Sequence, residues 1–294
     1  SRVDKENAQD TLNNNIITLA LFTLYYRVCN DSTSGIDDIF RKLMAELQIN
    51  YKSLQNGKVT ENNELRKFLF SRLEGNGIST FNQWFPLVES KNMYKGSTSN
   101  QIFLKTIHRV VSKYSKVDAG KDKDGEFCRL LFSDKTDESQ EEIHCADLYS
   151  HKLKSIEHLY PIIKKETDFA ELDWKWLESI GNLSTLPISI NSSLQDNSYK
   201  YKSLIFKAYS DKTPKSEIKE VRRQLKDNGV TITDTIEKVI KGDSSIGGRS
   251  SLTTHEILGE KCPNSIEDMK ERSENICSVF HTVVLHHVKP KLEE

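Results

Sequence analysis

The sequence of 294 residues lacks any long hydrophobic run, and this absence excludes a membrane-spanning helix. A spanning helix needs at least about 18 apolar residues in a row, whereas the most apolar stretch, residues 16–26, is short and contains two threonines. The chain begins at Ser1 without an initiator methionine or a basic-then-apolar leader. We therefore expect a fragment of a longer protein, without a signal peptide and located in the cytoplasm.

Closely spaced cysteine pairs are also missing. The five cysteines are an odd number and none lies in a CxxC pair, which favours reduced thiols over a disulfide framework. The group His144, Cys145 and His151 does not have the spacing of a standard zinc finger. A GxxxxGK[ST] phosphate-binding loop is absent too, so we expect no nucleotide hydrolysis.

The chain has almost no net charge, because 42 Lys and Arg residues face 43 Asp and Glu residues. This balance argues neither for nor against nucleic-acid binding, since electrostatic steering depends on where the charges lie. Residues 198–226 are locally basic, with nine Lys or Arg and three acidic residues. This segment is either a solvated helix face or a nucleic-acid-binding patch.

Hydrophobic periodicity predicts a mainly α fold with a small β component. Apolar residues recur at helical spacing over 8–29, 37–49, 62–73, 99–114 and 266–288. We assign Trp84 and Pro86 to a connecting stretch between helices. Residues 127–132 are either a short strand or a buried turn, and short strands are predicted at 155–160 and around 183–186. A helical stretch that Pro214 interrupts then runs to about residue 223.

The composition changes between residues 116 and 142, where a loop rich in Gly, Asp and Lys and an acidic segment flank a short apolar run. We place the domain boundary in this segment. The prediction is an α-helical linker or scaffold region over residues 1–125 and a second domain over residues 126–294.

Two short segments contain an unusual set of polar residues. SIEHLYP at 155–161 places Glu157 next to His158 at the end of an apolar strand. IGNLSTLPISIN at 180–191 places Asn182 in a turn and Asn191 at the start of a helix. Taken singly, each has an ordinary structural explanation, such as a packed histidine, a Gly-Asn turn or a helix cap.

Taken together, these residues resemble the active site of HNH nucleases of the ββα-metal group, in particular the C-terminal nuclease domain of GmrSD-type restriction endonucleases. That family has an acidic residue followed by His, two residues and Pro, then IGNL-x-x-LP, a helical Asn, an aromatic residue and a Lys. The matching positions are Glu157, His158, Pro161, residues 180–187, Asn191, Tyr199 and Lys202. The resemblance covers residues 150–210 and extends weakly to Arg272.

The sequence departs from the family pattern at three places. Ile162 stands where the family often has Gln, and Gln195 and Asp196 stand where a Ser-Asn pair is common. Asn182 follows His158 by 24 positions, so an insertion rich in acidic residues and tryptophan lies between them. None of these departures changes the residues expected to carry the chemistry, although the insertion could alter substrate access.

The resemblance implies an HNH core of the ββα-metal type, wrapped by helices, and the activity of a metal-dependent DNA endonuclease. It implies that Glu157 and Asn191 bind one Mg²⁺ or Mn²⁺, that His158 acts as general base, and that Asn182 orients the imidazole through a hydrogen bond. Three lysines of the basic segment are expected to bind the nucleic acid: Lys200, Lys202 and Lys207.

The resemblance also implies a place in a bacterial restriction or anti-phage system, in which the full-length protein carries an N-terminal nucleotide-binding module that this sequence lacks. Two alternatives stay open: a catalytically silent helical module that binds DNA or a partner chain, and an RNase that uses the same site. If the chain is a nuclease, the side chains of His158 and Asn191 should lie within about 12 Å of each other, around one metal-and-water site.

Overall fold

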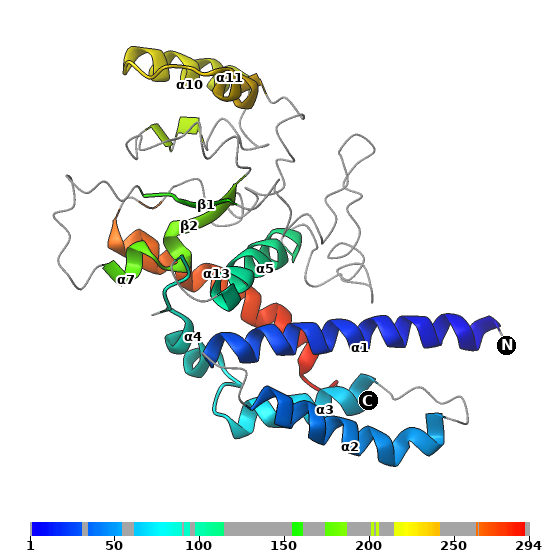
Figure 1. Cartoon of the computed structure of the whole chain (residues 1–294). Helices are drawn as coiled ribbons and strands as arrows, with labels where there is room; N and C mark the ends of the chain where they lie inside the picture. Colours follow the sequence, from blue (N-terminus) through cyan, green and yellow to red (C-terminus); the bar gives the residue numbers. More distant parts are fainter. Residues whose placement is uncertain are drawn as a thin grey trace. The chain divides into compact units, whose positions relative to one another are not determined.

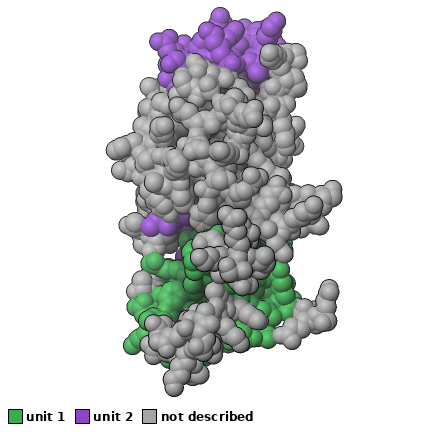
Figure 2. Space-filling view, turned by 90° about the vertical axis from the view of Figure 1, so that its right-hand side faces the viewer, with its two compact units in different colours: residues 1–88, 121–129, 278–294 green, residues 89–120, 130–277 purple. Residues whose placement is uncertain are grey.

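A computed structural model of the chain describes residues 2–30, 35–54, 62–89, 91–94, 98–114, 155–160, 174–186, 201–202, 204–205, 215–241, 263 and 265–291 (Figure 1). Contacts divide the chain into two compact units, which Figure 2 shows in different colours. Unit 1 comprises residues 1–88, 121–129 and 278–294, and unit 2 comprises residues 89–120 and 130–277. The predicted division at residues 125 and 126 stays a prediction.

The described residues are mainly helical with one two-stranded sheet, as the sequence predicted. The helices are α1 (Arg2–Cys29), α2 (Ile36–Leu54), α3 (Asn62–Gly75), α4 (Phe81–Glu89), α5 (Thr98–Tyr114), α7 (Trp174–Leu177), α10 (Lys215–Asp227), α11 (Asp234–Lys241) and α13 (Ile266–Val288), with the 3₁₀ turn η4 (Ile180–Asn182). The strands are β1 (Ser155–His158) and β2 (Leu183–Leu186). The strand or buried turn predicted at 127–132 lies outside the described residues.

None of the helices in the described ranges combines the length and the apolar character needed to cross a membrane. The two cysteines that the structure describes, Cys29 and Cys277, are free thiols, in agreement with the sequence prediction.

The assignment of Trp84 and Pro86 to a connecting stretch was wrong, because both residues lie in α4. The helix begins at a capping box: the Gln83 side-chain oxygen accepts hydrogen bonds from the Thr80 backbone N–H at 3.3 Å and from the Thr80 hydroxyl at 3.0 Å. Trp84 is fully buried and stacks on Tyr25 with ring centroids 4.5 Å apart. Packing of this large side chain stabilises a short helix that contains a proline.

Unit 1 has a core built on the apolar face of α1. The side chains of Leu21, Phe22 and Tyr25 of α1 are buried, and so is one face of α3. Within this unit, α1 packs against both α2 and α3. The Tyr25 hydroxyl donates a hydrogen bond to the Ile78 carbonyl at 2.8 Å, so the buried polar group is satisfied.

Unit 2 contains the small sheet. Strands β1 and β2 pair antiparallel, with Glu157 opposite Ser184 and His158 opposite Leu183 (Figure 1). Helix α5 packs against β2, and α7 contacts η4. The sheet is therefore supported by a helix from a distant part of the sequence, and the turn by the short helix that precedes it.

The Ile-Gly-Asn turn η4 is fixed by the first half of α13. A Cβ atom at Gly181 would overlap the Met269 carbonyl oxygen and the Ser273 hydroxyl, so only glycine permits this close approach. The buried guanidinium of Arg272 donates from Nη1 to the carbonyl oxygens of Ile180, Gly181 and Leu183, at 3.3, 2.7 and 3.1 Å. Arg272, to which the resemblance extends weakly, therefore binds the backbone of the Ile-Gly-Asn-Leu segment.

We predict that Gly181→Ala destabilises unit 2 by about 3 kcal/mol or more, because the new methyl group would have to displace the backbone of α13. Gly75→Ala is the matched control, since nothing lies within 4 Å of the Cβ position at the end of α3. Urea unfolding of both variants measures the difference. Equal midpoints for the two variants would contradict the close packing of η4 on α13.

Candidate active site

The first component of the site is a buried ion pair. Glu157 and Lys202 are 8% and 4% exposed, and the Lys202 ammonium forms an ion pair with Oε1 of Glu157. The same ammonium lies 3.4 Å from the His158 carbonyl oxygen and donates to it. Because a buried carboxylate is costly without a compensating cation, Lys202 stabilises the ionised form of Glu157 in β1.

The segment around Lys202 is held in place by apolar packing. Ile205 belongs to a buried cluster with Leu159, two side chains of α10 and two of α11. The Tyr201 hydroxyl donates to the Asn228 carbonyl at 3.0 Å. These contacts explain why Lys202 is directed to the sheet. Lys202, which is expected to bind phosphate, is buried against Glu157 in the structure, and its contact with phosphate stays a prediction.

The second component is His158, the neighbour of Glu157 in β1. Its ring lies beside Tyr94, with centroids 4.3 Å apart and the planes inclined by 57°. Its Nε2 atom lies 3.7 Å from Oε2 of Glu178. Since successive side chains of a strand point to opposite faces, Glu157 and His158 meet different partners.

The third component is Asn182, whose side chain is fully buried. Its Oδ1 accepts a hydrogen bond from the Tyr160 N–H at 2.7 Å, and its Nδ2 donates to the carbonyl oxygens of Tyr160 and Leu177 at 3.2 and 3.0 Å. The backbone of Asn182 also accepts a bond from the Leu159 N–H at 2.8 Å. None of these contacts is the expected bond to the imidazole, which stays a prediction. The observed bonds of Asn182 fix the two residues that follow His158.

Burial and charge keep a second histidine of this region neutral. His108 of α5 is buried, and this burial, together with the nearby charge of Arg272, lowers its pKa from 6.5 to about 3. His108 therefore carries no charge near pH 7. The positive charge next to η4 comes from Arg272.

The structure thus brings together four of the predicted site residues, namely Glu157, His158, Asn182 and Lys202. The other three predicted residues, Asn191, Lys200 and Lys207, lie outside the described residues, and so do Pro161 and Tyr199. In the part of the chain that the structure describes, no group of three His, Cys, Asp or Glu side chains could hold a metal ion.

Sequence reasoning missed Glu178 and Tyr94. Glu178 precedes the Ser-Ile-Gly-Asn sequence directly, so its proximity to a recognised motif was a usable signal. Tyr94 has no such signal in the sequence. Its neighbour Met93 is held by a long-range backbone hydrogen bond, from the Met93 N–H to the Glu178 carbonyl at 3.0 Å, which no local pattern predicts.

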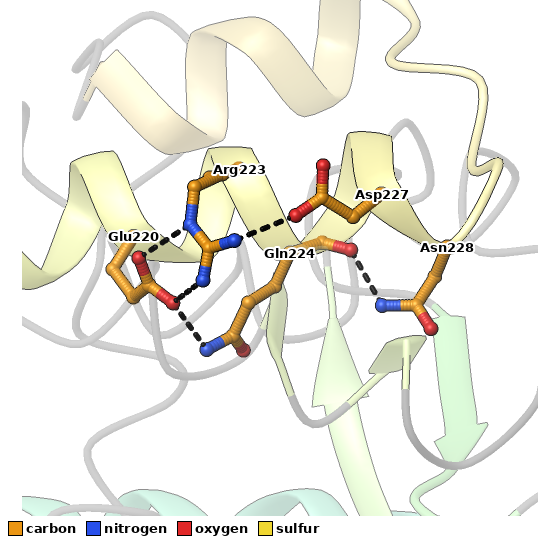
Figure 3. Close-up of polar contacts among 5 residues, drawn as sticks. All are labelled: Glu220, Arg223, Gln224, Asp227 and Asn228. Carbon is orange, nitrogen blue, oxygen red and sulfur yellow. Dashed lines mark hydrogen bonds and ion pairs between the residues drawn. The ribbon is translucent and has the colours of Figure 1, made fainter.

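The basic segment 198–226 is partly compensated by its own acidic neighbours. On α10, the Arg223 guanidinium binds Glu220 and Asp227, and Gln224 also binds Glu220 (Figure 3). These hydrogen bonds lower the pKa of Glu220 to about 2. Arg222 forms a further ion pair with Glu237 of α11, at 2.7 Å. For Arg222 and Arg223, the structure favours the solvated-face interpretation.

The fold and the site define a mainly α protein whose small antiparallel sheet carries a carboxylate and an imidazole side by side. Residues 97–239 match the family model of the C-terminal domain of GmrSD restriction endonucleases. The match confirms the resemblance inferred from the motif, and it indicates a nuclease, a hydrolase of the restriction-endonuclease type. A search of curated proteins found no matching sequence.

We predict that Lys202→Met lowers the free energy of unfolding by about 3–5 kcal/mol, because it leaves the buried Glu157 charge without a partner. The double variant with Glu157→Gln should recover most of this loss, which a double-mutant cycle measured by urea unfolding would detect. The control is Lys67→Met, which breaks an exposed pair with Glu64 and should have little effect. Additive effects at Glu157 and Lys202 would show that their pairing does not stabilise the protein.

Proposed function

We propose that the β1–β2 site is the active site of a metal-dependent endonuclease that hydrolyses a phosphodiester bond of DNA. The observation that carries this proposal is the adjacent pair Glu157 and His158, which lies in the segment similar to GmrSD C-terminal domains. A phosphodiester resists attack because its oxygens are already negative, so a nuclease needs a cation and a base. Glu157 offers a ligand for the cation, and His158 offers the base.

The donor chemistry fits a hard divalent ion. Carboxylate and amide oxygens are the ligands that Mg²⁺ and Mn²⁺ prefer, and the buried Glu157 carboxylate already pairs with a cationic group, the Lys202 ammonium. Glu157 and Asn191 would hold one ion. Two protein ligands are few, so tight binding would require phosphate oxygens as well. When bound, the ion would offset the charge of the phosphate and stabilise the leaving oxygen.

His158 would take a proton from the attacking water, a contribution of roughly 10²–10⁴-fold to the rate. Its side chain keeps 14% of its surface exposed, so solvent can reach the ring. Asn182 would act indirectly, because its hydrogen bonds hold the backbone that follows His158. The expected products carry 5′-phosphate and 3′-hydroxyl ends.

DNA would be bound by Lys200 and Lys207, while Lys202 would serve as the internal partner of Glu157. Neutralising phosphates releases counterions, so DNA affinity should fall steeply with salt. We also propose that the segment carrying Asn191 forms a helix after β2 that completes a ββα-metal core. The biological role would be that of an effector in a bacterial restriction or anti-phage system, together with an N-terminal nucleotide-binding module.

Two other functions are compatible with the same observations. An RNase could employ the same carboxylate and imidazole, because neither distinguishes ribose from deoxyribose. A silent DNA-binding or partner-binding module would depend on the basic segment, but the acidic neighbours of Arg222 and Arg223 weaken that basis. Parallel assays on supercoiled plasmid and on RNA, with Mg²⁺ or Mn²⁺ and with or without chelator, separate these functions.

We predict that His158→Ala abolishes plasmid nicking at every metal concentration, since no other group would replace the base. Asn191→Ala should instead raise the metal concentration needed for nicking, because one coordinating oxygen is lost. Additional Mn²⁺ should therefore partly restore Asn191→Ala but not His158→Ala. A titration of Mn²⁺ against the nicking rate measures both effects.

The matched controls are His286→Ala and Asn275→Ala, two exposed positions of α13 that should leave nicking unchanged. The unfolding midpoints of all variants must stay close to that of the parent chain. Restoration of His158→Ala by Mn²⁺ would mean that the roles of base and ligand are assigned wrongly.

A further inference from the structure

The imidazole of His158 contacts two groups from other segments of the chain. The centroid of the Tyr94 ring lies 4.3 Å from that of His158, and the Glu178 carboxylate lies 3.7 Å from Nε2. Their side chains belong to residues 64 positions before and 20 positions after His158 in the sequence. The ring is therefore held by tertiary structure, with Nε2 next to a carboxylate.

Glu178 is fixed in this position by its surroundings. Its side chain is only 7% exposed, and its carbonyl accepts the hydrogen bond from the Met93 N–H at 3.0 Å. Met93 is fully buried, so this bond joins the segment that carries Tyr94 to the segment that carries Glu178. A buried carboxylate held beside an imidazole is an arrangement that orients the ring.

We propose that Glu178 is the positioning residue of His158. The proposal rests on the function proposed for His158 above. The carboxylate attracts a proton on Nε2, which leaves the lone pair on Nδ1 and directs that nitrogen to the attacking water. It also stabilises the imidazolium that forms when Nδ1 accepts a proton. The packed ring of Tyr94 restricts rotation of the imidazole.

Every proton that moves in the proposed hydrolysis has a donor and an acceptor. Nδ1 of His158 takes one proton from water, and the resulting hydroxide oxygen forms a bond to phosphorus. The bond from phosphorus to the 3′ oxygen breaks, and this oxygen leaves with the electron pair and takes a proton from solvent. Glu178 takes up no proton in this step and faces the ring that carries the proton.

The test combines kinetics with nitrogen NMR of the histidine ring. Glu178→Gln preserves size and removes charge, so kcat for plasmid nicking should fall roughly 10–100-fold with KM for DNA nearly unchanged. The ¹⁵N spectrum of the neutral parent chain should show His158 with its proton on Nε2, identified by difference from His158→Ala. In Glu178→Gln the fraction of this tautomer should fall toward that of an unconstrained histidine ring, and Glu178→Asp should restore part of both effects.

Glu271→Gln is the matched control, because it removes an exposed carboxylate of α13 and should change neither kcat nor the tautomer. Glu178→Gln must also unfold at nearly the parent midpoint. Unchanged kcat or an unchanged tautomer in that variant overturns the proposal. The NMR measurement needs no metal or DNA, so it tests the effect of Glu178 on His158 separately from the proposed nuclease activity. A tautomer that depends on Glu178 in a chain that cuts neither DNA nor RNA would refute the proposed function and the catalytic role of Glu178 with it.

Discussion

The hydrogen bonds of one amide side chain determine the geometry of the candidate site. Asn182 binds both polar backbone groups of Tyr160 and the Leu177 carbonyl, so it joins the end of β1 to the segment before β2. The Asn182 side chain is fully buried, and losing a partner of its polar atoms would cost about 1–3 kcal/mol. The glycine before Asn182 lets α13 pack directly on the same turn. The Gly-Asn pair is thus a structural joint that places His158, and its role in chemistry would be indirect.

Two charge arrangements are built on this joint. On one face of β1, the Glu157 carboxylate is balanced by the buried ammonium of Lys202. On the other face, the His158 ring meets the Glu178 carboxylate. Because the Glu157 carboxylate is buried, its charge depends on the ammonium beside it. In the proposed function, this separation would let a single strand present a cation ligand and a proton acceptor at adjacent positions, the combination that phosphodiester hydrolysis requires.

The sequence was sufficient for the helices with clear 3.6-residue periodicity and for the positions of the two short strands, although not for their antiparallel register. The sequence was also sufficient to identify the family that the chain resembles, because the motif combines specific residues at fixed spacing. It failed for α4, where the Thr80 and Gln83 capping box was overlooked beside Pro86. The burial of Lys202 and the contact of Glu178 with His158 could not be predicted, since both depend on tertiary packing between segments that no local pattern connects.

The central claim is that the β1–β2 site binds a divalent ion and cuts DNA. The most direct measurement is a crystal structure of the His158→Ala chain with a short DNA duplex and Mn²⁺, in which anomalous scattering locates the metal. The account predicts Mn²⁺ about 2 Å from oxygen atoms of Glu157 and Asn191 and in contact with a DNA phosphate. Mn²⁺ and phosphate bound elsewhere, or residues 158 and 191 more than about 12 Å apart, would contradict it.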